Sequence, residues 1–264
     1  MSQVTHDHEI DRDLAADALI DPSRDDTRPQ PVEHPRPLPG LRYDVARSLD
    51  DVIEAWRLVY AVYRRAGLID RNAAELHCVP HAIGTDSVVA IGRIESLVVN
   101  TLSAYHDGPQ GLPLDSVYRR ELDWLRRQGR SLIEVGLFAD RREHLYRSIE
   151  AVMSLMRLST YFGVHTGATD AVIGVHPHHA AFYCRMLGFT QIGDEKSYET
   201  VNHKPVVLLH LNWVEATSAV KPCRGIRQFV ENPVETGYFN DRVDLTWEAV
   251  ADSPIGRRLE ACGA

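Results

Sequence analysis

Residues 131–189 read SLIEVGLFADRREHLYRSIEAVMSLMRLSTYFGVHTGATDAVIGVHPHHAAFYCRMLGF, and this stretch decides the fold. Its opening segment, Ser131–Ala139, is mostly apolar and predicts a strand. Apolar side chains then recur every three or four residues over His144–Phe162, which predicts a long helix. Ala171–Val175 predicts a short strand in the interior of a sheet, and His178–Leu187 predicts a second helix. Strand, helix, strand and helix in this order indicate an α/β domain.

Patterns on both sides extend this order. Ser48 and Asp51 have the spacing of a capping box, and the helix that they begin carries apolar residues as far as Leu68. The other predicted elements are strands at Leu41–Arg47, Ser87–Glu95, Leu97–His106, Phe189–Gly193 and Val206–Trp213, and a helix at Pro113–Gly129. The complete order predicts a mixed sheet with helices on both faces.

Three regions of different composition divide the 264 residues. Residues 1–40 hold nine acidic residues, four arginines and six of the 14 prolines, so we expect a disordered acidic arm. The alternative is a short amphipathic helix at Ile10–Ile20 that docks on a partner. Residues 41–213 contain the predicted elements and form one domain. Residues 214–264 have the composition of a folded segment without clear periodicity, and we expect a C-terminal extension of open role that packs on the domain.

The overall composition narrows the class of protein. A net charge of −8 disfavours a protein that binds nucleic acid through overall positive charge. Four widely spaced cysteines without a CxxC pair favour a reducing compartment over a disulfide framework or a zinc site. No apolar run reaches the roughly 18–20 residues of a membrane span, and the N-terminus lacks the pattern of a secretion signal. We therefore expect a cytoplasmic protein without a membrane span.

Several segments are similar to a known family. They are LVYAVYRRAGLID (58–70), GLPLD (111–115), ELDWLRRQGR (121–130), IEVGLFAD (133–140), VHPHHAAFYCRMLGF (175–189) and IGDEKSYETVNHKPVVLL (192–209). These segments resemble the N-acyl amino acid synthases, relatives of the acyl-homoserine-lactone synthases with a GNAT-type acyltransferase fold. The resemblance implies transfer of a long-chain fatty acyl group to the α-amine of an amino acid. Acyl carrier protein or acyl-coenzyme A would be the donor, and no permanently bound cofactor is implied.

Glu134 is the candidate catalytic residue. An ammonium group has no lone pair, so an amine that attacks a thioester needs a base to take its proton. Glu134 is the only acidic residue within the apolar stretch Leu132–Ala139, where burial would raise its pKa towards neutrality. It also matches the strand glutamate of the family that the chain resembles. The alternative role is an ion pair with Arg130 or another arginine.

Substrate-binding candidates lie around this strand. Gly136 indicates a β-bulge, and we expect the backbone of Gly136, Leu137 and Phe138 to supply N–H donors for the oxyanion. Arg130 and His176 are candidate anchors for the substrate.

Three tyrosines are further candidates. Tyr60 and Tyr63 border the acceptor or acyl pocket in our prediction, although such a stripe is also typical of a core. In many GNAT enzymes a tyrosine four residues before a Gly-Phe pair protonates the departing thiolate. Here Tyr183 stands five residues before Gly188 and Cys184 has the matching spacing, so Tyr183 has either this role or that of a core aromatic residue.

The histidines at His176-Pro177-His178-His179 do not predict a metal site. Adjacent histidines project in different directions, and no Asp, Glu or Cys stands at ligand spacing. Pro177 fits the first turn of a helix. We therefore expect no bound metal.

Residues 117–147 are locally basic within this acidic protein. Such a cluster suits an acidic carrier protein, although ordinary solvated helix faces are the alternative. The segment ADRREHLYR (139–147) also lacks the glycine-rich loop that binds the coenzyme A pyrophosphate in common GNAT enzymes, which favours a carrier-protein donor. The candidate docking residues are Arg119, Arg120, Arg126, Arg127, Arg141 and Arg142.

Two other functions remain as alternatives. An acyl-homoserine-lactone-type signal synthase would use S-adenosylmethionine, but Val59 and Leu137 occupy places where those enzymes carry arginine. A non-catalytic module that binds acyl chains or acyl carrier protein would use the same fold without turnover.

Overall fold

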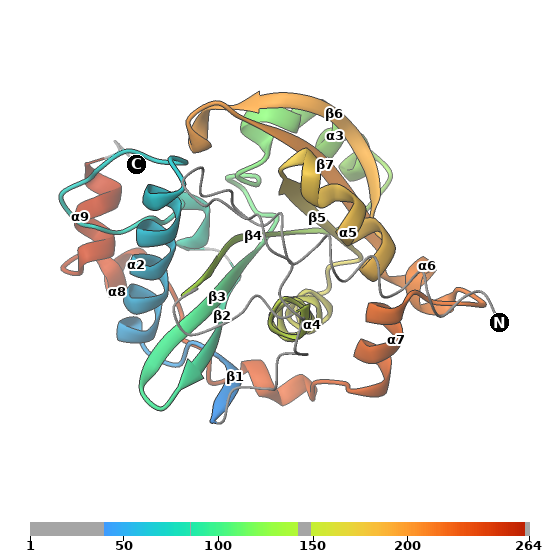
Figure 1. Cartoon of the computed structure of the whole chain (residues 1–264), viewed down its shortest axis with the longest axis horizontal. Coiled ribbons are helices and arrows are strands. Elements are labelled where there is room, and N and C mark those ends of the chain that lie inside the picture. Colours follow the sequence, from blue (N-terminus) through green and yellow to red (C-terminus); the bar gives the residue numbers. More distant parts are fainter. Residues whose placement is uncertain (1–39, 85, 142–148, 262–264) are drawn as a thin grey trace, which may run out of the picture.

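The computed structural model describes residues 40–84, 86–141 and 149–261 (Figure 1). Seven strands form one sheet, in the spatial order β1-β2-β3-β4-β5-β7-β6. Their bounds are Leu41–Val45 (β1), Ser87–Ile94 (β2), Leu97–His106 (β3), Leu132–Asp140 (β4), Asp170–Val175 (β5), Thr190–Tyr198 (β6) and Lys204–Asn212 (β7). The β4–β5 pair is parallel and the other pairs are antiparallel, so the sheet is mixed as predicted.

Four helices flank the sheet and smaller ones follow. The flanking helices are Leu49–Arg65 (α2), Asp115–Arg127 (α3), Ile149–His165 (α4) and Pro177–Leu187 (α5). The shorter helices are Trp213–Ser218 (α6), Arg224–Glu231 (α7), Trp247–Val250 (α8) and Pro254–Glu260 (α9), with 3-10 turns at Pro80–Ala82 (η1), Glu199–Val201 (η2) and Thr236–Phe239 (η3). No helix among the described residues is both long enough and apolar enough to span a membrane.

Capping residues define the start of α2 and the end of α5. At the start of α2, the Ser48 hydroxyl accepts a hydrogen bond from the Asp51 N–H, and the Asp51 carboxylate accepts one from the Ser48 N–H. This is the predicted capping box. At the end of α5, Gly188 adopts a left-handed conformation with φ of 76°, which glycine adopts without steric cost.

Alternating strand residues divide the core between the two faces of the sheet. Ile133 and Val135 of β4 pack in the cluster that contains α4 and α5, whereas Leu132 packs with α3. On β2, Val89 faces α2. Consequently α4 and α5 cover one face, and α2 and α3 cover the other; Figure 1 shows α2 and α4 on opposite sides of the β2–β3 ribbon.

The parallel pair in the middle of the sheet is short. β4 and β5 pair over only three residues, and the last pair joins Glu134 to Val172. Beyond this pair, β4 also carries a bulge, because Leu137 and Phe138 stand opposite the single residue Leu102 of β3. The sequence predicted the bulge at Gly136. In the structure it lies one residue further along, at Leu137, which has a φ of 52°.

The last two strands are longer than the sequence pattern indicates. The sequence pattern ends the predicted strand at Gly193, yet β6 continues through the polar stretch that follows, as far as Tyr198. β6 is an edge strand with much of its surface exposed, so its solvent-facing positions are polar and the apolar alternation is weak.

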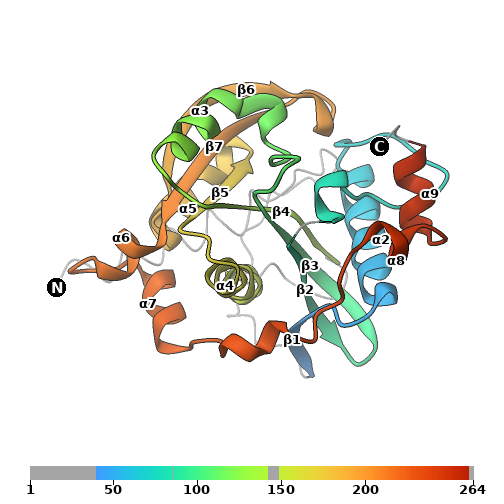
Figure 2. The same cartoon turned by 180° about the vertical axis from the view of Figure 1, so that it is seen from behind.

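The C-terminal extension runs along the domain from one end of the sheet to the other. α7 contacts α5, and the chain then runs past β1 to reach α8 and α9 beside α2 (Figure 2). Backbone hydrogen bonds from Val243 N–H to the Ala46 carbonyl and from Gly84 N–H to the Leu245 carbonyl attach it on this path. Its apolar residues, such as Phe239 and Leu259, are buried in the domain cores.

Candidate active site

A cavity of about 520 Å³ opens where β4 and β5 part. Its walls come from both strands beyond their last pair, and from α2, α4 and α5. Apolar side chains such as Met156, Ile173 and Phe182 line one part, and Glu134 lies in the wall. An apolar cavity with a few convergent polar groups is typical of a small-molecule site.

Glu134 is buried in this wall and poorly solvated. Only 6% of its surface is exposed, and its Oε2 accepts a hydrogen bond from the Leu114 N–H at 2.9 Å. Burial raises the pKa of Glu134 to about 8, the negative charges of Asp115 and Asp107 add to this, and the Leu114 hydrogen bond opposes it. A carboxyl with this pKa suits proton transfer near neutral pH.

The expected alternative partner of Glu134 lies elsewhere. The Arg130 guanidinium is 3.9 Å from the Asp170 carboxylate and 3.5 Å from the Glu215 carboxylate. Within the described part of the chain, no arginine pairs with Glu134, and Arg130 does not line the cavity. Among the described residues, Glu134 therefore has no neutralising cation, and Arg130 is paired elsewhere.

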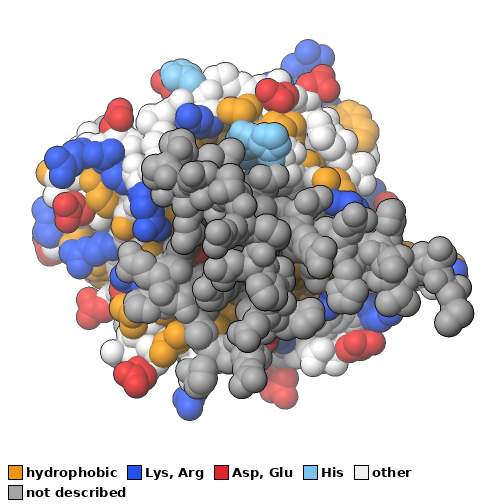
Figure 3. Space-filling view, viewed as in Figure 1, with side chains coloured by type: hydrophobic (Ala, Val, Ile, Leu, Met, Phe, Trp, Pro, Cys, Tyr) orange, Lys and Arg blue, Asp and Glu red, His pale blue; other side chains and the backbone are white. Residues whose placement is uncertain are grey.

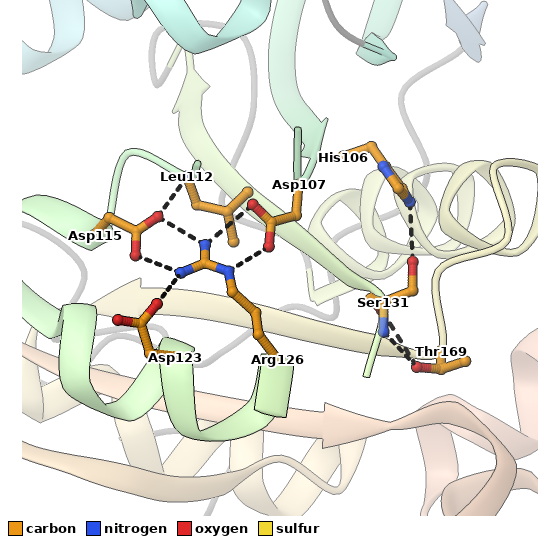
Figure 4. Close-up of polar contacts among 8 residues, drawn as sticks. All are labelled: His106, Asp107, Leu112, Asp115, Asp123, Arg126, Ser131 and Thr169. Carbon is orange, nitrogen blue, oxygen red and sulfur yellow. Dashed lines mark hydrogen bonds and ion pairs between the residues drawn. The ribbon is translucent and has the colours of Figure 1, made fainter. Parts of the chain in front are cut away.

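Leu114, the N-cap residue of α3, donates its backbone N–H to Glu134. Arg126 holds the start of this helix in place through the ion pairs shown in Figure 4. Arg126 Nε donates to Asp107 at 2.6 Å, and its terminal nitrogens donate to Asp115 at 2.7 Å and to Asp123 at 2.9 Å. These three ion pairs hold the loop after β3 against the helix. The guanidinium is thus engaged within the protein.

Two glycines shape the opposite walls. A Cβ on Gly174 of β5 would lie 2.6 Å from Leu114 Cδ2, so only glycine lets the α3 turn approach this strand so closely. A Cβ on Gly136 of β4 would meet only Glu134 Oε1, at 4.0 Å. Gly136 therefore borders open space beside Glu134.

The cavity and its buried glutamate lie inside a segment that a known family matches. The model of that family, described as N-acyl amino acid synthase FeeM, matches residues 54–212. This chain belongs to the FeeM family of N-acyl amino acid synthases. The resemblance seen in the sequence is therefore confirmed, and this FeeM-family protein is an N-acyltransferase.

Solved structures give the same answer for the fold. The structure of FeeM, an N-acyl amino acid synthase from uncultured soil microbes, has a TM-score of 0.57 and 28% identity, and the match covers 65% of this chain and 89% of FeeM. BjaI, a CoA-dependent acyl-homoserine lactone synthase, shares the fold with a TM-score of 0.51 and 11% identity over 78% of this chain and 92% of BjaI. The GNAT-type acyltransferase fold is confirmed. No curated protein matches the chain.

The bulge and three further candidates of this FeeM-family protein meet at the cavity. Gly136, Leu137 and Phe138 line it, as do Tyr63, Tyr183 and His176. In a bulge two residues oppose one, so backbone groups leave the regular ladder and become available to a ligand. Tyr60 is buried in α2 outside the cavity.

Tyr183 and Cys184 differ in their position relative to the cavity. Tyr183 lines the cavity and Cys184 does not, although Cys184 has the spacing expected from GNAT enzymes. The Tyr183 ring also packs edge-on against Phe182 and Phe189, so it combines a place in the wall with core contacts.

His176 begins α5 and lies at the cavity rim. Its Nδ1 accepts a hydrogen bond from the His178 N–H at 3.4 Å, and the two rings stack with centroids 4.9 Å apart. Burial lowers the pKa of His176, and the neighbouring His178 adds to this. The described residues contain no group of three or more His, Cys, Asp and Glu side chains able to hold a metal ion.

Two cavity residues escaped the sequence analysis. His77, of which 6% is exposed, has no hydrogen-bond partner at its Nε2 among the described residues, and burial lowers its pKa to about 4, helped by the charge of Arg258. Tyr198 lies near Glu134, and burial raises its pKa to about 12. His77 stands in an irregular segment and Tyr198 in a polar strand, so neither carried a periodic signal.

The predicted carrier-docking arginines do not form one surface. Arg126 is engaged in its three ion pairs, and Arg141 donates to the Val98 carbonyl at the far end of β4. β4 has nine residues, so roughly 27 Å separates its ends. The exposed members on α3 are Arg119, Arg120 and Arg127, and Arg142 lies outside the described residues.

Proposed function

We propose that this protein transfers a long-chain fatty acyl group from an acyl thioester to the α-amine of an amino acid, with Glu134 as the general base. The observation that carries this proposal is the buried, unneutralised Glu134 carboxyl in the wall of an apolar cavity. FeeM, to which this chain is similar in structure, is an N-acyl amino acid synthase, which supports the proposal.

The reaction proceeds by direct attack. The ionised Glu134 takes a proton from the ammonium group, and the amine nitrogen attacks the thioester carbonyl carbon to form the C–N bond. Backbone N–H groups of the bulge at Leu137 and Phe138 stabilise the oxyanion. The tetrahedral intermediate collapses, the C–S bond breaks, and the sulfur leaves as a thiolate. Tyr183 donates a proton to this thiolate and regains one from the nitrogen, so the products are an amide and a thiol.

The donor in this proposal is acyl carrier protein. Its phosphopantetheine lacks the adenosine end of coenzyme A, for which the segment 139–147 offers no glycine-rich loop. On α3, Arg120, Trp124 and Arg127 follow at i, i+4 and i+7, and all three are exposed. A basic helix face with an exposed aromatic residue suits an acidic protein partner. Acyl-coenzyme A remains the alternative donor.

Product analysis tests the function. Purified protein is incubated with long-chain acyl carrier protein or with acyl-coenzyme A, each together with all twenty amino acids, and the products are identified by mass spectrometry. We expect an N-acyl amino acid, formed faster with the carrier-protein donor. Absence of any acylated product with both donors would overturn catalysis, whereas equal rates would overturn only the donor assignment.

A further inference from the structure

A second cavity of about 470 Å³ adjoins the first. The two share wall residues, including His77 and Tyr198. The remaining walls come from the loop that follows α2, from the segment around η1, and from Arg258 of α9. The site therefore has two compartments, an apolar one beside β4 and β5 and a polar one beside α9.

The charge of the polar compartment favours a carboxylate. Its lining residues include Arg71 and Arg258, and Asp70 is the only acidic residue among the described lining residues. Guanidinium groups bind carboxylates through paired, charge-assisted hydrogen bonds. Figure 3 shows Lys and Arg side chains gathered on the side of the molecule where α2 and α9 lie, so an anionic ligand is attracted to this side.

His77 gives an independent sign of a ligand. Its ring stands in the wall common to both compartments, and its buried Nε2 has no hydrogen-bond partner within the described structure. A buried polar atom without a partner is costly, so a bound molecule that offers a hydrogen bond to His77 Nε2 would be stabilised at this place.

We propose that the second cavity is the acceptor subsite, in which Arg258 and Arg71 bind the α-carboxylate of the amino acid while its amine reaches past His77 towards Glu134. This inference rests on the proposed function. The carboxylate and the amine of one small molecule would thus occupy the polar compartment and the junction, and the acyl chain would occupy the apolar compartment.

Arg258 lies outside residues 54–212, the segment that the family model matches. It belongs to α9 in the C-terminal extension. α9 is firmly placed, because Ile255 and Leu259 are buried and the Ser253 hydroxyl caps its first turn. The extension therefore supplies a specificity-determining residue in addition to its packing.

Kinetics of one substitution with a matched control test the subsite. We compare Arg258→Met with Arg257→Met, because Arg257 is the exposed neighbour on the same helix and does not line the cavity. With the best amino acid from the product analysis varied at saturating donor, Arg258→Met should raise the acceptor KM about 10- to 100-fold, as expected for a lost charged hydrogen bond. The donor KM should not change, and Arg257→Met should resemble the original protein. Equal acceptor KM values in both variants would overturn the inference while leaving the function intact.

Three further measurements keep the inference testable. Arg71→Gln, on the exposed loop, should also raise the acceptor KM. This variant tests the subsite if Arg258→Met does not fold. The original protein should use the amino acid faster than its α-carboxamide derivative, in which the carboxylate is replaced by an amide. Arg258→Met should lose this preference for the carboxylate. If no variant turns over, ligand-detected NMR with a mixture of the twenty amino acids should show binding to the original protein that Arg258→Met abolishes; equal binding would overturn the subsite.

Discussion

Glu134 is the residue on which the proposed chemistry depends. Glu134→Gln keeps the size of the side chain and its hydrogen bond from the Leu114 amide but removes the base. We expect kcat to fall by about 10²- to 10⁴-fold, with the donor KM nearly unchanged. Glu121→Gln, in which the changed carboxylate pairs with Lys196 outside the cavity, is the control and should keep full activity. Undiminished turnover of Glu134→Gln would contradict the assignment.

The raised pKa of Glu134 predicts the pH dependence of the rate. Below about 8 the carboxyl is mostly protonated and cannot accept a proton, so kcat should rise as the pH increases through this value. Measurements of kcat from pH 6 to 9 should show this rise, and the residual kcat of Glu134→Gln should not show it. A flat profile for the original protein would exclude Glu134 as the titrating base.

The same pKa makes stability depend on pH. The folded protein keeps the Glu134 proton up to about 8, whereas a free glutamate loses it near 4.5. The unfolding free energy therefore falls as the pH rises from 4.5 to 8. Relative to the original protein, Glu134→Gln should gain little stability at pH 5 and about 2–4 kcal/mol at pH 9, measured by urea unfolding. A gain independent of pH would show that Glu134 is not desolvated.

At the scale of elements, the separation of β4 and β5 creates the cavity, and glycines on the two strands have different tasks. Gly136→Leu adds a side chain where a Cβ meets only open space and Glu134 Oε1. We expect kcat/KM to fall at least about 10-fold because the cavity is partly filled, while the Tm changes little. By contrast, Gly174→Ala should lower the Tm, because its Cβ would collide with Leu114. Full activity of Gly136→Leu would place the substrate elsewhere.

The first turn of α3 is tied to the sheet by Arg126, and its loss should alter chemistry as well as stability. In Arg126→Ala, the charges of Asp107 and Asp115 lose their partner and raise the pKa of Glu134 further. The pH at which kcat rises should increase, and the free energy of unfolding should fall by about 1–3 kcal/mol. In Arg126→Lys, which keeps the charge, the pH at which kcat rises should change less. If the free energy of unfolding falls but the pH dependence of kcat is unchanged, Arg126 has only a structural role.

For the whole molecule, local sequence patterns predicted the helices and strands better than they predicted the contacts between these elements. The capping box at Ser48 and the glycine stop at Gly188 depend on neighbouring residues, so they could be recognised before folding. The ion pairs of Arg126 and the junction position of His77 depend on segments far apart in the chain. For this reason the sequence indicated a basic cluster where the structure has an internal network.

Glu134 could be recognised from its local sequence, whereas Arg258 could not. Glu134 was conspicuous as a single acid in an apolar strand, and the structure places it in the cavity wall. Arg258 gave no signal, because α9 is short and its packing against α2 and the loop after η1 arises only when the extension has crossed the domain.

That crossing has a consequence for how the enzyme can diverge. The first cavity is lined by residues of the domain, whereas Arg258 belongs to the C-terminal extension. Under the proposed assignment, exchange of this one stretch by recombination would alter how the carboxylate of the acceptor is held, while the first cavity and Glu134 stay the same. The proposed subsite would thus let acceptor binding evolve separately from acyl binding.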